Sequence, residues 1–127
     1  MSNFSVGFRT HEDIQILDLH GELDAHTAPE LEAALQQCLK EGHHQILING
    51  RNLDYISSAG LGVFMAYIEE IREKGGDLKI AELKPNVYNV FDLLGFPLLF
   101  DIVPTEAEAL ARFARQERPV PPSSLKP

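Results

Sequence analysis

The chain alternates short apolar runs with longer segments of helical period, and this alternation restricts its fold more than any other feature. The apolar runs lie at residues 14–20, 45–49, 77–81 and 99–103. A further run at 4–9 comes before them, and the polar residues 11–13 form a turn between it and the next run. This order predicts an α/β fold: a mixed, largely parallel β-sheet with an N-terminal hairpin, covered by about four α-helices.

Four segments carry helix signals. They begin near Thr27, Ser58, Pro85 and Thr105. Thr27 and Thr105 are each followed by a glutamate at the spacing of a capping box, so we expect their side chains to cap the first and last helices. Residues 21–26 are predicted to form a loop, the second helix to end at Lys74 and the last helix to end near Glu117. The expected buried positions are Leu61, Phe64, Met65, Ile68 and Ile71 in the second helix and Val87, Val90, Phe91 and Leu94 in the third.

The length of 127 residues corresponds to one domain with its own core. We assign residues 1–117 to this domain. Residues 118–127 hold four of the eight prolines and little apolar surface to bury, which predicts a flexible tail. The single cysteine, Cys38, lies on the apolar side of a predicted helix, where a small buried side chain is expected.

The net charge of −8 limits the partners of the chain. Nucleic acid and anionic lipid both attract basic surfaces, so neither a nucleic acid nor a membrane is an expected partner. The N-terminus lacks a basic segment followed by an apolar block, and no apolar run approaches the ~20 residues of a membrane helix. We therefore expect a cytoplasmic protein that binds another protein or a small ligand.

Two adjacent serines stand where the 45–49 strand gives way to the second helix. The free N–H groups and the positive end of the helix dipole lie there, so a negative group is tolerated. By local chemistry alone, Ser57 is suited to cap the helix with its side chain. A serine at this place can also be a nucleophile or a phosphate acceptor.

The glycines after the serines are not explained by capping. Gly60 and Gly62 lie in the first two helical turns, where each costs up to ~1 kcal/mol relative to alanine. They indicate close approach by another backbone or a bulky group. The helical arc opposite the buried stripe holds Ala59, Gly62, Val63, Ala66, Tyr67, Glu69, Glu70 and Glu73. A partner helix could lie against the small residues of this arc, or the arc could pack beneath a loop of the same chain.

Phosphorylation of Ser58 would place nearly two negative charges at the start of the helix. The helix dipole tolerates this charge, so the fold should survive. The same group would obstruct a partner docked on Gly62 and Ala66. Asp24 lies in a loop that leads from a strand to a helix, and such loops gather at one edge of a parallel sheet, so it could be a neighbour of Ser58.

Four stretches of the chain resemble the STAS-domain anti-sigma-factor antagonists of bacteria. In family order they are residues 21–24, 55–62, 75–78 and 91–96 with 100–102. The likeness covers about residues 4–115 and implies a STAS fold. The family pattern at the serine motif is Asp-Ser, then Ser, Thr or Ala, then Gly-Leu, and its second position is phosphorylated.

This pattern puts the phosphorylated position on Ser58 and replaces the family acid with Ser57, a second and less favoured acceptor. The family aspartate before the first helix matches Asp24, and an acid often found on the central strand is replaced by Asn49. Together with the outward arc, the resemblance implies a partner-binding surface made of Asp24, Asn49, Ser57, Ser58, Ala59, Gly60, Gly62, Val63 and Ala66.

The resemblance also implies a mechanism. The unphosphorylated protein would bind an anti-sigma factor that is a serine kinase with a GHKL-type ATP site, and so free a sigma factor. Nothing in the sequence itself demands more than a monomer. The kinase would phosphorylate Ser58 and break the complex, and a metal-dependent serine phosphatase would reset it. The chain itself would be a binding module and a substrate, with no cofactor or metal.

Two other functions are compatible with the residues. A hydrolase is disfavoured because the Gly-x-Ser-x-Gly elbow and the Gly-x-x-x-x-Gly-Lys phosphate loop are both missing from the sequence. A STAS subunit of a transporter or lipid-export complex would use the same helix face without phosphorylation. In that case the apolar residues Phe96, Pro97 and Leu98 would be exposed for docking, although they could equally cover the edge of the sheet.

Overall fold

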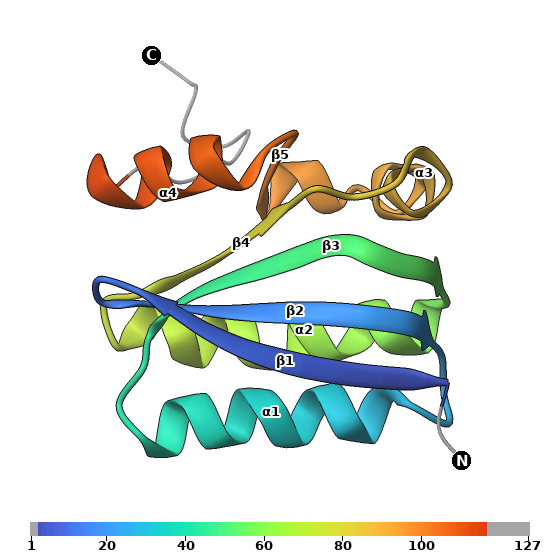
Figure 1. The fold of residues 1–127 in the computed structure, drawn as a ribbon, viewed down its shortest axis with the longest axis horizontal. Coiled ribbons are helices and arrows are strands. Elements are labelled where there is room, and N and C mark those ends of the chain that lie inside the picture. The colour runs from blue at the N-terminus through green and yellow to red at the C-terminus, as the bar shows by residue number, and fades with distance from the viewer. Residues whose placement is uncertain (1–2, 117–127) are drawn as a thin grey trace.

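The computed structural model describes residues 3–116, which form one mixed five-stranded sheet (Figure 1). Its strands are β1 (Phe4–His11), β2 (Ile14–Leu23), β3 (Gln45–Ile56), β4 (Asp77–Ala81) and β5 (Asp101–Val103). They stand side by side in chain order. β1 pairs with β2 antiparallel, and every later pair is parallel. The predicted mixed sheet with an N-terminal hairpin is therefore confirmed.

Four α-helices and one short 3-10 turn connect and cover the strands. They are α1 (Ala28–Lys40), α2 (Ser58–Glu73), α3 (Pro85–Leu93), the turn η1 (Phe96–Leu98) and α4 (Glu106–Ala114). α1 and α2 lie on one face of the sheet, and α4 lies on the other (Figure 1). The number of helices agrees with the prediction.

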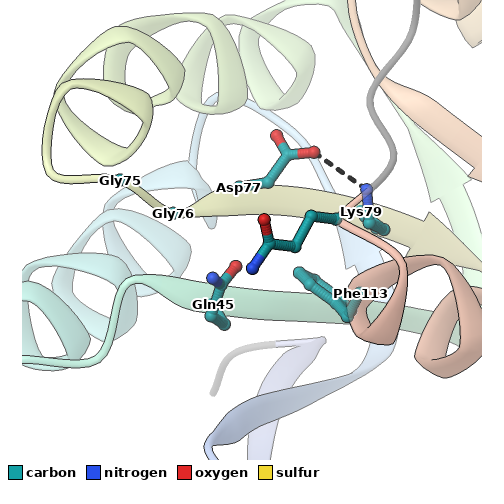
Figure 2. Close-up of a pocket in the computed structure, with 7 residues that line it drawn as sticks. Gln45, Gly75, Gly76, Asp77, Lys79 and Phe113 are labelled. Atoms are coloured by element: carbon teal, nitrogen blue, oxygen red, sulfur yellow. Dashed lines mark hydrogen bonds and ion pairs between the residues drawn. The ribbon is translucent and has the colours of Figure 1, made fainter.

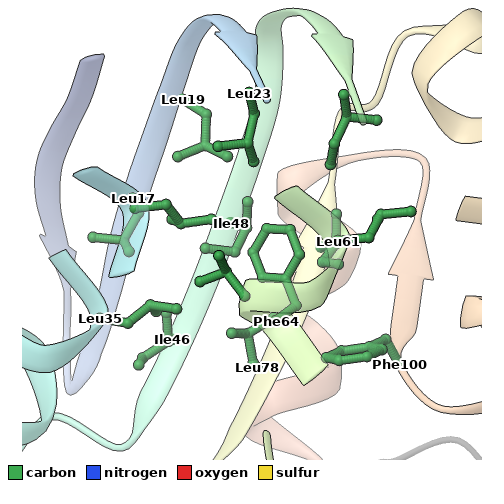
Figure 3. Packing of buried hydrophobic residues seen from close by; sticks show 14 of the residues in the cluster. Leu17, Leu19, Leu23, Leu35, Ile46, Ile48, Leu61, Phe64, Leu78 and Phe100 are labelled. Carbon is green, nitrogen blue, oxygen red and sulfur yellow. The ribbon is translucent and has the colours of Figure 1, made fainter. Parts of the chain in front are cut away.

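The larger core fills the space between the sheet and the pair α1 and α2. Figure 3 shows Phe64 of α2 among Leu17, Ile48 and Leu78 of the sheet. α3 and η1 close the end of this core, since the Phe64 ring lies 6.1 Å from Phe91 of α3, and the Phe91 ring lies 5.5 Å from Phe96 of η1. Each fully buried side chain of this size stabilises the fold by roughly 1.5–3 kcal/mol.

A smaller core lies beneath α4 on the opposite face. Ile16, Leu47 and Ala81 of the three central strands meet Ala109 and Phe113 of α4 there. β2 and β3 are thus covered on both faces along these residues. This explains why their sequences are continuous apolar runs rather than alternating ones.

Two strands are longer than their apolar runs predict. β3 was expected to end at Asn49 but continues to Ile56, and β2 continues past Gly21 to Leu23. The two extensions pair with each other through register shifts, and Gly21 has a φ of 97° at one of them. Backbone hydrogen bonds keep these segments in the sheet although polar side chains interrupt their apolar sequence pattern. The predicted loop at 21–26 is therefore wrong for its first three residues.

At the C-terminal side, two boundaries also differ. β5 begins at Asp101 rather than at residue 99, and α4 ends at Ala114. Glu117 and the predicted tail at 118–127 lie outside the described residues.

Three burial predictions for the helices are wrong. Met65 and Leu94 were assigned to the core but are 43% and 54% exposed. Val63 was assigned to the outward arc but is buried. For Val63 the cause is α1, which packs beside α2 there: Gln36 of α1 donates to the hydroxyl of Tyr67, one turn after Val63, over 2.7 Å. Of the two roles left open for Phe96, exposed docking and cover of the sheet, its burial favours the second: Phe96 is 5% exposed and its ring stacks on that of Phe100 at 5.1 Å. The predicted burial of Cys38 is confirmed.

Candidate functional site

Ser57 and Ser58 lie at the junction where β3 ends and α2 begins. The backbone N–H of Ser57 donates to the carbonyl oxygen of Leu23, at the end of β2, over 2.9 Å. The two loops that follow β2 and β3 are therefore neighbours at the carboxyl edge of the parallel strands, as expected. Sites in α/β sheets gather at this edge.

The two serines differ in exposure. Ser58 is exposed, whereas the Ser57 hydroxyl oxygen is buried and has no hydrogen-bond partner among the described residues. Ser57 has the extended backbone of an N-cap residue, but its side chain makes no capping hydrogen bond to α2. The prediction that its side chain caps the helix is therefore wrong. Ser58 is the accessible hydroxyl.

The start of α2 leaves several backbone donors unused. Within residues 3–116, no acceptor contacts the N–H groups of Ser58, Ala59 and Gly60. The first intrahelical bond runs from Leu61 N–H to the Ser57 carbonyl oxygen over 3.1 Å. The partial positive charge of the helix terminus is consequently available to an acceptor from outside.

The two glycines of α2 serve different purposes. A Cβ on Gly60 would lie 2.7 Å from Cγ of Leu23 and 3.1 Å from the Leu23 carbonyl oxygen. The predicted close approach is thus confirmed at Gly60, and it comes from β2 of the same chain. A Cβ on Gly62 would have no atom within 4 Å. Gly62 is exposed and, with exposed Ala59 and Ala66, leaves a smooth outer face on α2.

Asp24 is held in place by its own loop. Its Oδ1 accepts from the backbone N–H groups of His26 (2.9 Å) and Thr27 (3.1 Å). Burial alone would raise the pKa of Asp24, but these hydrogen bonds outweigh it and the pKa lies below its ordinary value. The carboxylate therefore stays ionised beside the serine junction.

Thr27 does not cap α1 as predicted. Its Oγ1 accepts from the Asp24 backbone N–H over 2.9 Å and donates to the Glu22 carbonyl oxygen over 2.8 Å. These bonds tie the loop after β2 to itself and leave no side-chain cap on the helix. The corresponding prediction for Thr105 is confirmed, because its Oγ1 accepts from the Glu108 N–H over 3.2 Å.

Asn49 does not join the serines. It lies in the middle of β3, and its Nδ2 donates to Oε1 of Glu106, in α4, over 2.9 Å. Asn49 therefore faces α4, whereas α2 covers the other face of the sheet. Its predicted place in the partner-binding surface is wrong because β3 extends seven residues further than its apolar run indicates.

Sequence reasoning missed a cation on the same edge of the molecule. Lys84 forms an ion pair with Asp54 of β3, and Asn86 Nδ2 donates to the Asp54 carbonyl oxygen over 3.0 Å. These contacts fasten the start of α3 to β3 shortly before the serines. No local signal predicts the pair, because its members are 30 residues apart.

Comparison with known proteins gives the family. The STAS domain family model matches residues 6–109. The chain belongs to the STAS-domain family. BtrV of Bordetella bronchiseptica, named as an anti-sigma factor antagonist, is 36% identical to this STAS domain over 95 residues, which are 75% of this chain and 82% of BtrV. The anti-sigma-B factor antagonist of Staphylococcus epidermidis is 31% identical over 100 residues, 79% of this chain and 93% of the relative.

A solved structure has the same fold. The crystal structure of an anti-sigma factor antagonist from Mycobacterium paratuberculosis superposes with a TM-score of 0.80 at 23% identity, over 90% of this chain and 95% of the other. The STAS fold expected from the serine motif and its companions is therefore confirmed. A transporter scaffold is the less supported of the two functions left open by the sequence, because the named relatives are anti-sigma factor antagonists.

The STAS domain also carries a buried ion network at the other end of the parallel strands, where β4 and β5 begin. Lys79 is 1% exposed, and its Nζ lies 3.0 Å from a carboxylate oxygen of Asp77 and 3.0 Å from one of Asp101. Arg72 of α2 contacts Asp77 at 2.9 Å, and Arg112 of α4 contacts Asp101 at 2.5 Å. Lys79 lines a cavity of about 380 Å³ beside Gln45 and Phe113 (Figure 2).

This network pairs its charges within the fold and lies away from the serines, so we assign it to stability. Among residues 3–116, no group of three or more His, Cys, Asp or Glu side chains could hold a metal ion. The helices of the described part of the chain include none of the length and apolarity needed to cross a membrane.

Proposed function

We propose that this STAS domain is an anti-sigma factor antagonist controlled by phosphorylation of Ser58. In the unphosphorylated state it binds an anti-sigma factor and so releases the sigma factor that the anti-sigma factor holds. The names of its relatives support this function. The observation that carries it is the exposed Ser58 hydroxyl, placed at an uncapped helix start beside a smooth face of α2.

The proposed docking surface consists of Asp24, Ser58, Ala59, Gly62 and Ala66. With no side-chain bulk at Gly62 and only methyl groups at Ala59 and Ala66, an element of the partner can approach the backbone of α2 closely. Asp24 stays ionised at the border of this surface and suits a basic residue of the partner. Val63, Gly60 and Ser57 support the surface from within.

The anti-sigma factor is proposed to be a serine kinase of the GHKL type. The Ser58 oxygen attacks the γ-phosphorus of ATP, the bond between that phosphorus and the ADP oxygen breaks, and the hydroxyl proton passes to a base of the kinase. A metal-dependent serine phosphatase would hydrolyse the phosphoserine and restore the hydroxyl. Within this scheme the STAS domain is the substrate and supplies no catalytic group.

Phosphorylation would disrupt the complex without unfolding the domain. The new group carries about −1.5 to −2 charges and three acceptor oxygens. It would stand on the smooth face of α2, next to the ionised Asp24, where both its bulk and its charge oppose docking. The fold tolerates it because the site is exposed and lies at the positive end of the helix dipole.

Substitution of Ser58 tests this function. Ser58→Glu is expected to weaken binding to the cognate anti-sigma factor at least tenfold, measured by calorimetry, because a like-charge contact in an interface typically costs several kcal/mol. The melting temperature of this variant should stay within a few degrees of wild type. Ser5→Glu, an exposed serine on β1, is the matched control and should bind normally. With ATP, phosphate should enter the wild type but not Ser58→Ala. A Ser58→Glu variant that binds as tightly as wild type would refute the switch.

A further inference from the structure

The outer edge of β1 carries no neighbouring strand. β1 stands at one end of the strand order, and within residues 3–116 it pairs only with β2 (Figure 1). Its pairing with β2 runs from Phe4 to His11 without a bulge, and its sequence holds no proline. Natural sheets commonly interrupt a long edge with a proline, a bulge or an outward charge, because the open edge is a template for another strand.

The phase of the β1–β2 pairing identifies the residues that face outward. Just before β1, the carbonyl oxygen of Asn3 accepts from the N–H of Glu22 over 3.0 Å. Bonded positions alternate along an antiparallel pair, so odd-numbered residues of β1 bond to β2 and even-numbered ones direct their N–H and C=O groups away from it. Phe4 is buried at 5% exposure. The outward residues that a second strand can reach are therefore Val6, Phe8 and Thr10, a set symmetric about Phe8.

One face of this edge is apolar. Phe8 is 48% exposed, and together with Val6 it lines a groove of about 340 Å³ between β1 and α1. Ala33 and Ala34 line the α1 side of the groove, whose remaining residues include Glu30 and Gln37. A second aromatic ring beside Phe8 would cover apolar surface that is now in contact with water.

The charge of β1 lies on the opposite face of the sheet. The guanidinium of Arg9 contacts Asp18 and, in α4, Glu106, each at 2.6 Å, and it is held over the sheet by these bonds. Gly7 stands between Asp18 and the open edge, since it pairs with Asp18 and has no side chain. The edge thus presents a cation at Arg9 and, two residues away, a gap that leads to a carboxylate.

We propose that β1 pairs antiparallel with β1 of a second copy of this chain, about a two-fold axis at Phe8, so that the two sheets join into one. In this register Phe8 lies opposite the partner's Phe8, and Val6 lies opposite the partner's Thr10. The outward N–H and C=O groups of all three residues then gain partners. Aromatic pairs and pairs of β-branched residues are favourable across antiparallel strands.

Charge complementarity favours a second copy over an unrelated strand. Arg9 lies opposite the partner's Gly7 in this register, and the partner's Asp18 is the next residue across the sheet. The guanidinium therefore meets a second carboxylate through the gap that the glycine leaves, and the same contact is repeated on the other side of the axis.

Other registers fit less well. A shift by one residue would set the apolar face of one strand beside the Arg9 face of the other. An axis at Gly7 would place Thr10 opposite the partner's Phe4, which is buried. The proposal does not depend on phosphorylation of Ser58, and no residue of β1 belongs to the docking surface proposed for the anti-sigma factor.

Sedimentation velocity of the full chain tests the pairing. The mass is expected to rise from one copy towards two between about 1 μM and about 1 mM protein at about 0.15 M salt. Phe8→Lys sets two like charges opposite each other at the axis and should raise the dimer dissociation constant about tenfold or more. Tyr88→Lys replaces an aromatic residue of α3 that is 38% exposed and is the matched control, which should dimerise like wild type. Circular dichroism should show both variants folded.

Cross-linking tests the register. In the Phe8→Cys variant the two introduced residues lie at the axis with Cα atoms about 5.5 Å apart, within the span of a disulfide, so oxidation should give a covalent dimer. In Ser5→Cys the two residues are six positions apart along the strands, about 20 Å, and should not cross-link. Cys38 is buried, so the wild type serves as the blank.

Three results would overturn the assignment. The first is a chain that remains a single copy at about 1 mM. The second is a dimer that Tyr88→Lys disrupts and Phe8→Lys does not, which would place the interface elsewhere. The third is a Ser5→Cys variant that cross-links as well as Phe8→Cys, which would exclude an axis at Phe8.

Discussion

At the scale of single residues, identical residue types on one helix meet opposite surroundings. Gly60 and Gly62 both lie near the start of α2. A Cβ on Gly60 would collide with Leu23, whereas a Cβ on Gly62 would have no atom within 4 Å. Ser57 and Ser58 differ in the same way, one enclosed and one exposed. The inner member of each pair fits α2 to the end of β2, and the outer member remains available to a partner.

The two glycines are therefore expected to respond oppositely to alanine. Gly60→Ala forces a Cβ against Leu23 and should destabilise the fold by about 1–2 kcal/mol after the helix propensity gain is subtracted. Gly62→Ala meets no atom and should stabilise it by up to about 1 kcal/mol. Urea denaturation of both variants measures the difference. Equal effects at the two sites would contradict the contact between α2 and β2.

At the scale of elements, side-chain bonds on the α4 face connect segments that are distant in sequence. Glu106 in the first turn of α4 accepts from Arg9 of β1 over 2.6 Å and from Asn49 of β3 over 2.9 Å. Arg9 also forms two bonds with the carboxylate of Asp18 on β2, at 2.6 and 2.8 Å. The start of α4 is thus bonded directly to β1 and β3, and through Arg9 to β2. This polar contact uses the residue that the sequence had suggested for partner binding, Asn49.

The Glu106 contact makes stability depend on pH. Hydrogen bonding to Arg9 is the main cause that lowers the pKa of Glu106 below its ordinary value. A lowered pKa means that the contact contributes fully above the ordinary pKa of a glutamate, about 4.3, and is lost as pH falls through the folded value. Glu106→Gln should therefore lose less stability than wild type between pH 5 and about pH 3, measured by urea denaturation at each pH. Parallel losses in both proteins would refute this contribution.

At the scale of the whole molecule, the two ends of the parallel strands carry different kinds of residues. The carboxyl edge of the parallel strands carries the serine junction, the Asp24 loop and the Lys84–Asp54 pair. The amino ends of β4 and β5 carry the buried network around Lys79, which joins α2, β4, β5 and α4. The buried network around Lys79 therefore lies away from Ser58, and charge added at Ser58 is not expected to disturb it.

Removal of the central cation of this network should be costly. Lys79→Met leaves Asp77 and Asp101 buried with one cation fewer and is expected to destabilise the fold by about 3 kcal/mol or more. Lys84→Met removes an exposed ion pair and serves as the matched control, with an expected loss of about 1 kcal/mol or less. Urea denaturation gives both values. A loss in Lys79→Met no larger than in the control would show that the network is dispensable.

The sequence by itself determined the order of elements, the mixed sheet and the place of Ser58, because hydrophobic period, turn residues and helix starts are local properties of the chain. The tertiary structure decided which hydroxyl is exposed, which glycine is pressed by a neighbour and where Asn49 faces. Each of these depends on a contact between distant segments: Leu23 with Gly60, α1 with the Val63 side of α2, and the extended pairing of β2 with β3. Such contacts arise only when the chain packs, so residue spacing does not encode them.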